Sequence, residues 1–204
     1  MTTPVTGSQI LVLASASPRR RELLAALGIR LQIEPSPAPE PARRPGEPAA
    51  AFVMRAARAK AGLVARRHTT GLVLGADTIV QVANRMLGKP ASEEEARHML
   101  RSLSGRWHEV FTGICLIDCA SGRSRAGHAC SRVHFRRLQG QEIDWYLATG
   151  EHRDKAGAYA IQGLASLFID RIEGCYFNVV GFPIFTFARI CRRLGLRLWG
   201  LNST

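Results

Sequence analysis

The stretch Val73-Leu74-Gly75-Ala76-Asp77-Thr78-Ile79-Val80 reads as a buried strand, because it is apolar, rich in β-branched residues and without a helical period. One carboxylate, Asp77, lies in its middle. Burying a carboxylate is costly unless it is paired or bound to a metal. Gly75 and Ala76 leave room for something to approach the backbone beside it. We therefore predict that Asp77 is a functional residue; the alternative is a structural carboxylate that caps a turn or a helix.

The length of 204 residues suffices for one sizeable core, either a single α/β domain or two lobes around a cleft. No apolar run is long enough to span a bilayer, so we expect no membrane association. We also expect no secretory signal, because no charged segment precedes a long apolar run near residue 1. The five cysteines form no CxxC pair, and their odd number favours reduced thiols in a cytoplasmic protein.

The net charge of +12, from 28 Lys and Arg against 16 Asp and Glu, permits a polyanionic partner. That partner is either a phosphorylated small molecule or a nucleic acid. The arginines are dispersed and lack interleaved aromatic residues, which argues against a nucleic-acid platform. The chain uses Arg for almost all of its positive charge, so Lys60, Lys89 and Lys155 stand out; each lies near an apolar run.

The remaining pattern alternates strands and helices, as in an α/β protein. Strands are expected at residues 10–14, 107–118, about 125–135 and 167–169, and helices at 18–27, about 47–67, from 93 to 103, 141–149 and about 183–194. A hairpin is expected at residues 83–85, a proline-rich loop at 35–48 and a Gly/Ala-rich loop at 154–163. The next-to-last segment, 174–183, reads as a turn.

The sequence around the start of the helix expected at 18–27 predicts an anion-binding site. Ser17 suits the N-cap, Pro18 suits the first helical position, and Gly28 ends the helix, with Leu23, Leu24 and Leu27 on one face. The positive end of the helix dipole together with Arg19 or Arg20 can bind phosphate oxygens. The alternative is an ordinary capped helix with exposed arginines.

A second feature is Lys60, which falls inside or at the edge of the apolar face of the helix at about 47–67. The alternative is a lysine that keeps its ammonium in water and buries only its stem. In the proline-rich loop before this helix, Glu40 can lend a carboxylate to a cleft.

Together, six motifs resemble the Maf family of nucleoside triphosphate pyrophosphatases, in family order from about residue 10 to 195. They are Ala14-Ser15-Ala16-Ser17-Pro18-Arg19-Arg20, Gly75-Ala76-Asp77-Thr78, Gly88-Lys89-Pro90, Leu103-Ser104-Gly105, Asp154-Lys155-Ala156-Gly157-Ala158-Tyr159 and Asn178-Val179-Val180-Gly181. The resemblance implies an α/β fold with a mixed, twisted sheet, flanking helices and two lobes around a deep cleft, similar to the inosine-triphosphatase fold. We expect one Maf-like domain over residues 1–204, with peripheral tails at 1–9 and 196–204.

The Gly/Ala-rich loop, continued by Ile161-Gln162-Gly163, resembles the branch of the family that acts on dTTP and UTP. By this resemblance Asp77 is the proton acceptor, and Arg19, Thr78 and Gln162 contribute to substrate choice. The other polar positions carried over are Ser15, Arg20, Glu40, Lys60 and Lys89, which would bind substrate. Two positions depart from the family pattern: Ala160 stands where Gly is expected, and Ser131-Arg132-Val133 stands where Thr-x-Val is usual.

The expected reaction is hydrolysis of dTTP or UTP to the monophosphate and pyrophosphate. Asp77 would deprotonate the attacking water or, with Glu40, hold Mg²⁺ or Mn²⁺, and the cationic side chains would neutralise the triphosphate. No Walker A motif is present. The alternatives are a pyrophosphatase for 7-methyl-GTP, and a non-catalytic protein that binds nucleic acid or a cell-division partner, as the older family label of septum formation inhibitor implies. We expect a nucleotide substrate, no stable nucleic-acid complex and a cytoplasmic location, and leave a homodimer open.

Overall fold

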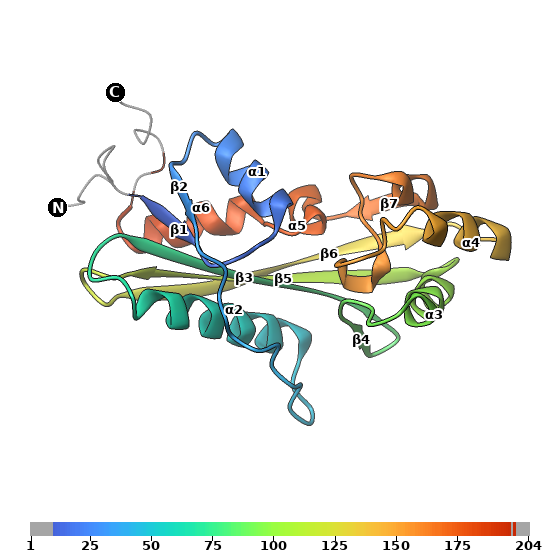
Figure 1. The fold of residues 1–204 in the computed structure, drawn as a ribbon, viewed down its shortest axis with the longest axis horizontal. Helices are drawn as coiled ribbons and strands as arrows, with labels where there is room; N and C mark the ends of the chain where they lie inside the picture. The colour runs from blue at the N-terminus through green and yellow to red at the C-terminus, as the bar shows by residue number, and fades with distance from the viewer. Residues whose placement is uncertain (1–9, 197, 199–204) are drawn as a thin grey trace. The chain divides into compact units, whose positions relative to one another are not determined.

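The computed structural model describes residues 10–196 and residue 198 (Figure 1). Helices and strands are interspersed along the chain, as expected for an α/β protein, although β4 directly follows β3 and β6 directly follows β5. The strands are β1 (Leu11–Leu13), β2 (Leu31–Ile33), β3 (Leu72–Val82), β4 (Arg85–Leu87), β5 (Trp107–Asp118), β6 (Ser124–Phe135) and β7 (Ile169–Glu173). The α-helices are α1 (Pro18–Ala26), α2 (Ala49–Ala65), α3 (Glu93–Leu103), α4 (Gly140–Ala148), α5 (Tyr176–Val180) and α6 (Ile184–Arg193), and the 3-10 helices are η1 (Ala156–Ala158) and η2 (Leu164–Phe168).

The strands form one seven-stranded mixed sheet in the order β2-β1-β3-β5-β6-β7, with β4 paired to β3. Strand β1 is parallel to both β2 and β3, whereas β4 is antiparallel to β3 and β7 is antiparallel to β6. The mixed α/β class predicted from the sequence is therefore confirmed.

The chain divides into two compact units. The first takes in the residues up to Asp77, Thr112–Ala129 and the residues from Gly181 on; the second comprises Thr78–Phe111 and Cys130–Val180. The long strands β3, β5 and β6 each contribute to both units. The prediction of a single domain over residues 1–204 stays a prediction.

In the first unit, helices cover both faces of the sheet: α2 lies on one face, and α1 and α6 lie on the other (Figure 1). Strand residues that point to opposite faces enter different cores. The core under α2 contains Val12, Ala57, Ala61, Val64, Val73 and Cys115. The core under α1 and α6 contains, among others, Leu13, Leu24, Leu74, Ile114, Phe187 and Ile190.

Two glycines let α2 lie unusually close to the sheet. A Cβ atom at Gly75 of β3 would stand 2.3 Å from the carbonyl oxygen of Ala57, and one at Gly113 of β5 would stand 2.4 Å from that of Val53. No side chain fits at either place, because the obstacles are backbone atoms of the helix. The prediction that Gly75 leaves room for another segment is confirmed, and that segment is α2.

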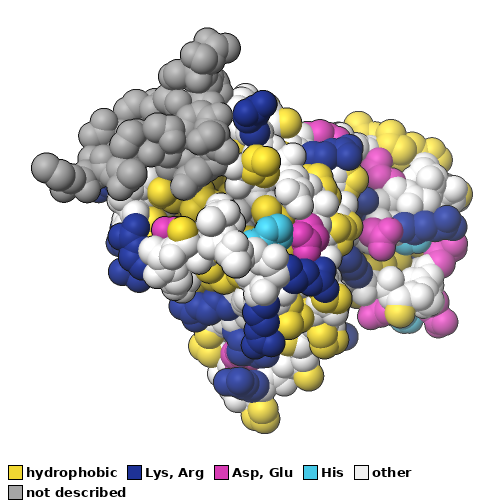
Figure 2. Space-filling view, turned by 60° about the vertical axis from the view of Figure 1, so that its left-hand side comes forward, with side chains coloured by type: hydrophobic (Ala, Val, Ile, Leu, Met, Phe, Trp, Pro, Cys, Tyr) yellow, Lys and Arg dark blue, Asp and Glu magenta, His cyan; other side chains and the backbone are white. Residues whose placement is uncertain are grey.

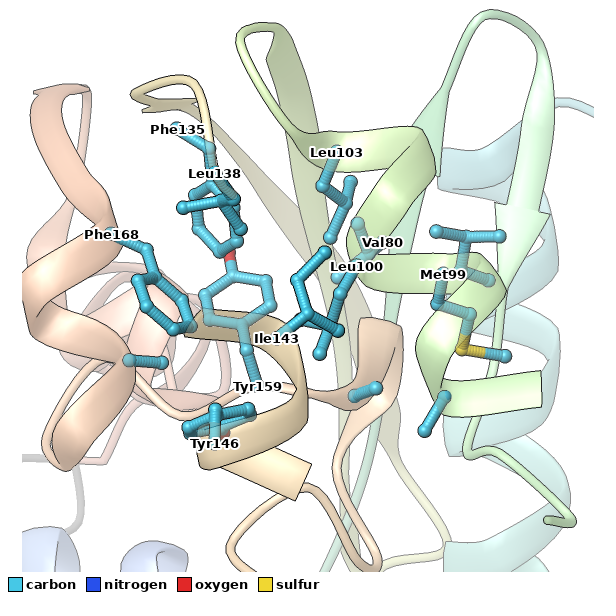
Figure 3. Close-up of a cluster of buried hydrophobic side chains, with 14 of the residues drawn as sticks. Val80, Met99, Leu100, Leu103, Phe135, Leu138, Ile143, Tyr146, Tyr159 and Phe168 are labelled. Carbon is cyan, nitrogen blue, oxygen red and sulfur yellow. The ribbon is translucent and has the colours of Figure 1, made fainter. Parts of the chain in front are cut away.

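The second unit has its own core, in which aromatic rings pack edge to face (Figure 3). The ring of Tyr159 lies 4.9 Å from that of Phe135, and the ring of Tyr146 lies 5.3 Å from that of Phe168. The Tyr159 hydroxyl is hydrogen bonded to Nε2 of buried His108 at 2.8 Å. Burial lowers the pKa of His108 to about 4, so this core holds a neutral imidazole.

Several expected elements end where predicted, and others do not. Residues 167–169 were predicted as a strand, but residues up to Phe168 belong to η2 and β7 begins only at Ile169. Neither β2 nor α5 was predicted, because three and five residues carry too little periodicity. Of the three leucines predicted to share one face of the first helix, Leu24 is buried, whereas Leu27 lies just past the helix end at Ala26 and is 37% exposed.

The starts of α1 and α3 differ in their capping. Among the described residues, the Ser17 side chain makes no capping hydrogen bond at the start of α1. At α3, by contrast, the Ser92 side chain accepts a hydrogen bond from Glu95 N at 3.1 Å, and the Glu95 carboxylate accepts one from Ala91 N at 2.6 Å.

All five cysteines are free thiols, and Cys130 is the exposed one. Of the tails predicted at 1–9 and 196–204, residues 1–9, 197 and 199–204 lie outside the described residues. Leu196 and Leu198, by contrast, pack against the core under α1 and α6. Within the described part of the chain, no helix combines the length and the apolarity that crossing a bilayer requires.

Candidate active site

Asp77 is buried in β3, with 5% of its surface exposed, and is paired with a lysine from α2. The ammonium of Lys60 donates a hydrogen bond to Asp77 Oδ1 at 2.6 Å. The same ammonium contacts Glu40 Oε1 at 3.2 Å, from the proline-rich loop. Asp77, Lys60 and Glu40, which the sequence singled out, thus lie together. The Lys60 ammonium contacts both carboxylates and is not surrounded by water alone.

The pKa of the Asp77 carboxyl reflects two opposing influences. Burial raises this pKa above its ordinary value, and the adjacent Lys60 ammonium lowers it. The Arg20 guanidinium also lowers it, whereas the Glu40 carboxylate raises it. Lys60 therefore favours the ionised carboxylate, the form that can accept a proton or bind a cation.

The position of Lys60 follows from the packing of α2. Lys60 lies between Ala57 and Ala61, the two residues whose backbone stands over Gly75. Asp77 is two residues beyond Gly75 in the same strand. The close approach that the missing side chain of Gly75 permits is therefore what brings the lysine to the carboxylate.

Arg20, predicted to bind substrate phosphates, is half-buried and bonded to three separate segments of the first unit. Its Nε donates to the carbonyl oxygen of Gly181 at 3.0 Å, and its Nη1 donates to the carbonyl oxygen of Ala76 and to Ser15 Oγ, each at 3.0 Å. Burial lowers the pKa of this guanidinium, and the Asp77 carboxylate raises it. These bonds tie the loop after β1 and the segment before α6 to the residue that precedes Asp77.

Ser15 and Arg19 are the other candidate phosphate ligands of this region. Ser15 Oγ accepts hydrogen bonds from Ser17 N at 3.2 Å and from Arg20. Arg19 is half-buried in the first turn of α1. The structure therefore places Ser15, Arg19, Arg20, Glu40, Lys60 and Asp77 in the first unit.

The other three candidates, Thr78, Lys89 and Gln162, belong to the second unit. Thr78 is half-buried, and Lys89 and Gln162 are exposed. The Gly157 N–H donates to the carbonyl oxygen of Gly88 at 2.9 Å, which joins the Gly/Ala-rich loop to the segment that carries Lys89. At Gly157 a Cβ atom would stand 2.8 Å from the Val80 side chain, and φ is +69°.

Comparison with known proteins identifies the family. The family model described as Maf-like protein matches residues 10–194. The chain belongs to the Maf family. The relatives of this Maf protein include one from Desulforamulus reducens that is 46% identical over 92% of this chain and 98% of the relative, and one from Moorella thermoacetica that is 50% identical over 93% and 97%. Both relatives are named dTTP/UTP pyrophosphatase.

Among solved structures, the Maf protein has a weaker likeness to a nucleoside-triphosphatase, a dITP/XTP pyrophosphatase from Mycobacterium abscessus. The identity is 14%, the alignment covers 63% of this chain and 75% of that chain, and the TM-score is 0.40. That TM-score is too low to show a shared fold.

Two groups in this Maf protein were missed by the sequence reasoning. One is Gly113, whose role under α2 has no local sequence signal. The other is Glu151, whose carboxylate accepts hydrogen bonds from two backbone N–H groups directly after Gln162 and Gly163. A carboxylate just before a Gly-rich loop is the one signal that the sequence offers for Glu151.

The residues predicted to hold a metal ion are Asp77 and Glu40. Among the residues that the structure describes, no three His, Cys, Asp or Glu side chains gather in a way that could hold a metal. Mg²⁺, however, is commonly held by one or two carboxylates together with substrate phosphates and water. Two carboxylates that already share one cationic partner fit such a site.

Proposed function

We propose that this Maf-family protein is a nucleoside triphosphate pyrophosphatase that hydrolyses dTTP and UTP to the monophosphate and pyrophosphate. The observation that carries the proposal is the ion pair between buried Asp77, in the middle of β3, and half-buried Lys60 of α2, joined at 2.6 Å. The names of the two relatives, at about half identity over nearly the whole chain, support the same reaction and the same substrates.

Asp77 is the proposed proton acceptor. Cleavage of the α–β phosphoanhydride requires an oriented water molecule and neutralisation of growing negative charge, and little covalent chemistry from the protein. The carboxylate takes one proton from the attacking water while the bond to the leaving pyrophosphate breaks. Lys60 supports this step in two ways, since it favours the ionised form of Asp77 and supplies a positive charge.

Asp77 and Glu40 would hold a Mg²⁺ or Mn²⁺ ion, which would supply further charge neutralisation on the phosphates. Arg19 and Lys89 are proposed to bind phosphate oxygens directly. For Arg20, the hydrogen bonds to Gly181, Ala76 and Ser15 support an additional role in holding the backbone beside Asp77.

Base selection is assigned to Gln162, with Arg19 and Thr78. An amide carries both a donor and an acceptor, so it can donate to O4 or O2 of uracil or thymine and accept from N3–H. Cytosine presents an amino group at position 4 and has no proton on N3, so the same amide pairs poorly with it. Gln162 is exposed, which leaves its amide accessible to a ligand.

The free thiols and the odd number of cysteines support the proposed cytoplasmic location. A homodimer and a role in septum formation stay predictions. On the face that Figure 2 shows, Lys and Arg side chains lie in several groups with hydrophobic and other side chains between them, which gives no particular support to a nucleic-acid complex.

The test is an assay of pyrophosphate release by the purified protein with dTTP, UTP, CTP and 7-methyl-GTP, each with Mg²⁺ or Mn²⁺ and with a chelator. We expect dTTP and UTP to give the highest kcat/KM, and pyrophosphate rather than phosphate as product. A preference for 7-methyl-GTP would assign the protein to the other substrate class. Absence of pyrophosphate release from every nucleotide would refute the enzymatic proposal.

A further inference from the structure

The Gly/Ala-rich loop that carries Gln162 has a strained backbone. Asp154, Gly157 and Ala158 have positive φ values of 58°, 69° and 62°. For a residue other than Gly, this left-handed region is unfavourable by roughly 1–2 kcal/mol. A loop with two such residues needs support from its surroundings to keep one conformation.

One support lies on the N-terminal side of Gln162, where the Gly157 N–H donates to the carbonyl oxygen of Gly88. The other lies directly after Gln162 and comes from the Glu151 carboxylate. Glu151 Oε2 accepts from Leu164 N at 2.8 Å, and Oε1 accepts from Ala165 N at 3.3 Å. These two N–H groups open the 3-10 helix η2, so the carboxylate acts as its cap.

Glu151 itself is held in place by α4. Its backbone N–H donates to Thr149 Oγ1 at 3.2 Å, and its Oε1 accepts from the hydroxyl of Tyr146 at 3.2 Å. The Tyr146 side chain is fully buried and packs on Phe168, the last residue of η2 (Figure 3). The Glu151 carboxylate is thus attached to the buried core through Tyr146 as well as to the loop.

Gly163 shows how closely the carboxylate and the loop fit. A Cβ atom at Gly163 would stand 2.3 Å from Glu151 Oε2 and 2.5 Å from Oε1. The Gly163 N–H donates to the carbonyl oxygen of Ala160 at 3.2 Å, which closes a turn with Ile161 and Gln162 at its centre. The carboxylate therefore fills the place that a side chain would take and determines where this turn can lie.

We propose that Glu151 is a positioning residue for base selection: its carboxylate fixes the turn of residues 160–163 so that Gln162 presents its amide to a uracil or thymine edge. This inference rests on the proposed function, because it gives Gln162 the role of reading the base. Glu151 itself does not contact the nucleotide. The competing interpretation is that Glu151 caps η2 for stability alone, with no effect on the choice of base.

The variants are Glu151→Gln and Glu151→Ala, alone and combined with Gln162→Ala. In Glu151→Gln, one amide oxygen can still accept from Leu164 N, but the amide NH₂ faces the Ala165 N–H and cannot accept from it. The matched control is Glu142→Gln. Glu142 is also a capping carboxylate of the second unit, since it accepts from Gln139 N at 2.9 Å at the start of α4. Among the described residues its side chain is bonded to Gln139 and Arg136, neither of which lies in the turn of residues 160–163.

Two quantities are measured for each variant: kcat/KM for dTTP, UTP and CTP, and Kd for UMP and CMP by calorimetry. We expect the UTP-to-CTP ratio of kcat/KM to fall about fivefold or more in both Glu151 variants, because discrimination by buried hydrogen bonds is worth about 5- to 150-fold. The UMP-to-CMP preference in Kd should narrow in parallel. Once Gln162 is Ala, the Glu151 substitution should change neither ratio further. Glu142→Gln should leave both ratios unchanged.

Unchanged UTP-to-CTP and UMP-to-CMP ratios in Glu151→Gln and Glu151→Ala would overturn the inference. So would a Glu151 substitution that changes these ratios equally in the wild type and in Gln162→Ala. Thermal unfolding shows whether each variant is folded, and Glu151→Gln serves if Glu151→Ala is not. The Kd measurements need no turnover. If the wild-type protein releases no pyrophosphate, the proposed reaction is wrong. The role of Glu151 is then still decided by whether its substitution narrows the preference for UMP over CMP.

Discussion

A single methyl group added at Gly75 should separate the helix that carries Lys60 from the strand that carries Asp77. In Gly75→Ala the new Cβ atom would stand 2.3 Å from Ala57 O, 2.7 Å from Ala61 N and 2.9 Å from Ala61 Cβ. Two of these three atoms belong to the helix backbone, so no rotation of a side chain relieves the contact. The helix must move, or the strand must.

The size of the effect follows from these distances. Ordinary contacts begin at 3.4 Å, so the Ala57 oxygen must retreat by about 1 Å. Overpacking of a core costs about 1–3 kcal/mol, and we expect the upper end because the obstacle is backbone. For a chain of this length, about 3 kcal/mol corresponds to a Tm lower by roughly 6–12 °C. A displacement of about 1 Å at a catalytic group can also reduce kcat/KM by about 100-fold.

The assay compares Gly75→Ala with Gly62→Ala, a substitution in the same helix. Gly62 has no atom within 4 Å of its added Cβ and has an ordinary helical backbone. Gly62→Ala should therefore raise stability by about 0.5–1 kcal/mol and leave kcat/KM unchanged. If Gly75→Ala melts and turns over like the wild type, the close approach of α2 does not position Lys60, and the reasoning fails.

Substitutions at three further residues test other parts of the proposal. Lys60→Met should move the acid limb of the kcat/KM profile to higher pH, because the Lys60 ammonium lowers the pKa of Asp77, which burial raises. Lys60→Arg keeps the positive charge and should leave the acid limb near its original pH. If the acid limb does not move in Lys60→Met, it does not report the titration of Asp77. Lys89→Ala should raise KM and lower kcat about tenfold or more with little change in Tm, because negative charge on the phosphates grows in the transition state. A large loss of stability with normal kinetics would contradict the role of Lys89 in binding phosphate. His108→Gln should flatten the pH dependence of thermal unfolding, because burial holds the pKa of folded His108 at about 4, against the ordinary 6.5 of an exposed imidazole. The contribution of His108 to stability is therefore complete above pH 6.5 and is lost as pH falls toward 4, by up to about 3 kcal/mol, and an equal slope in both proteins between pH 4 and 7 would rule this out.

The strand that carries Asp77 and the helix that carries Lys60 were predictable because both are long and strongly patterned. Strand β3 has eleven residues and α2 has seventeen, so the periodicity of each identifies its type. A lysine on the apolar face of such a helix and a carboxylate in such a strand each stand out against their neighbours. Their pairing, however, depends on the register of α2 over Gly75, which no local pattern encodes.

The environment of Arg20 was less predictable. The sequence predicted Arg20 as a phosphate ligand, with an exposed arginine as the alternative, and gave no sign that its guanidinium donates to the carbonyl oxygens of Ala76 and Gly181, which are distant in the chain. The error at residues 167–169 has a similar cause. Leu167 and Phe168 have the β-propensity of a strand, but the Glu151 carboxylate caps the N–H groups of Leu164 and Ala165 and begins a 3-10 helix there.

The most direct test of the central claim is the rate of pyrophosphate release from dTTP by the wild type and by Asp77→Asn. The substitution keeps the volume of the side chain but removes the group that accepts the proton and carries the charge. We predict that Asp77→Asn stays folded and still binds the nucleotide, with turnover lower by at least about 100-fold. Pyrophosphate release near the wild-type rate would mean that Asp77 is a structural residue and that the proposed mechanism is wrong.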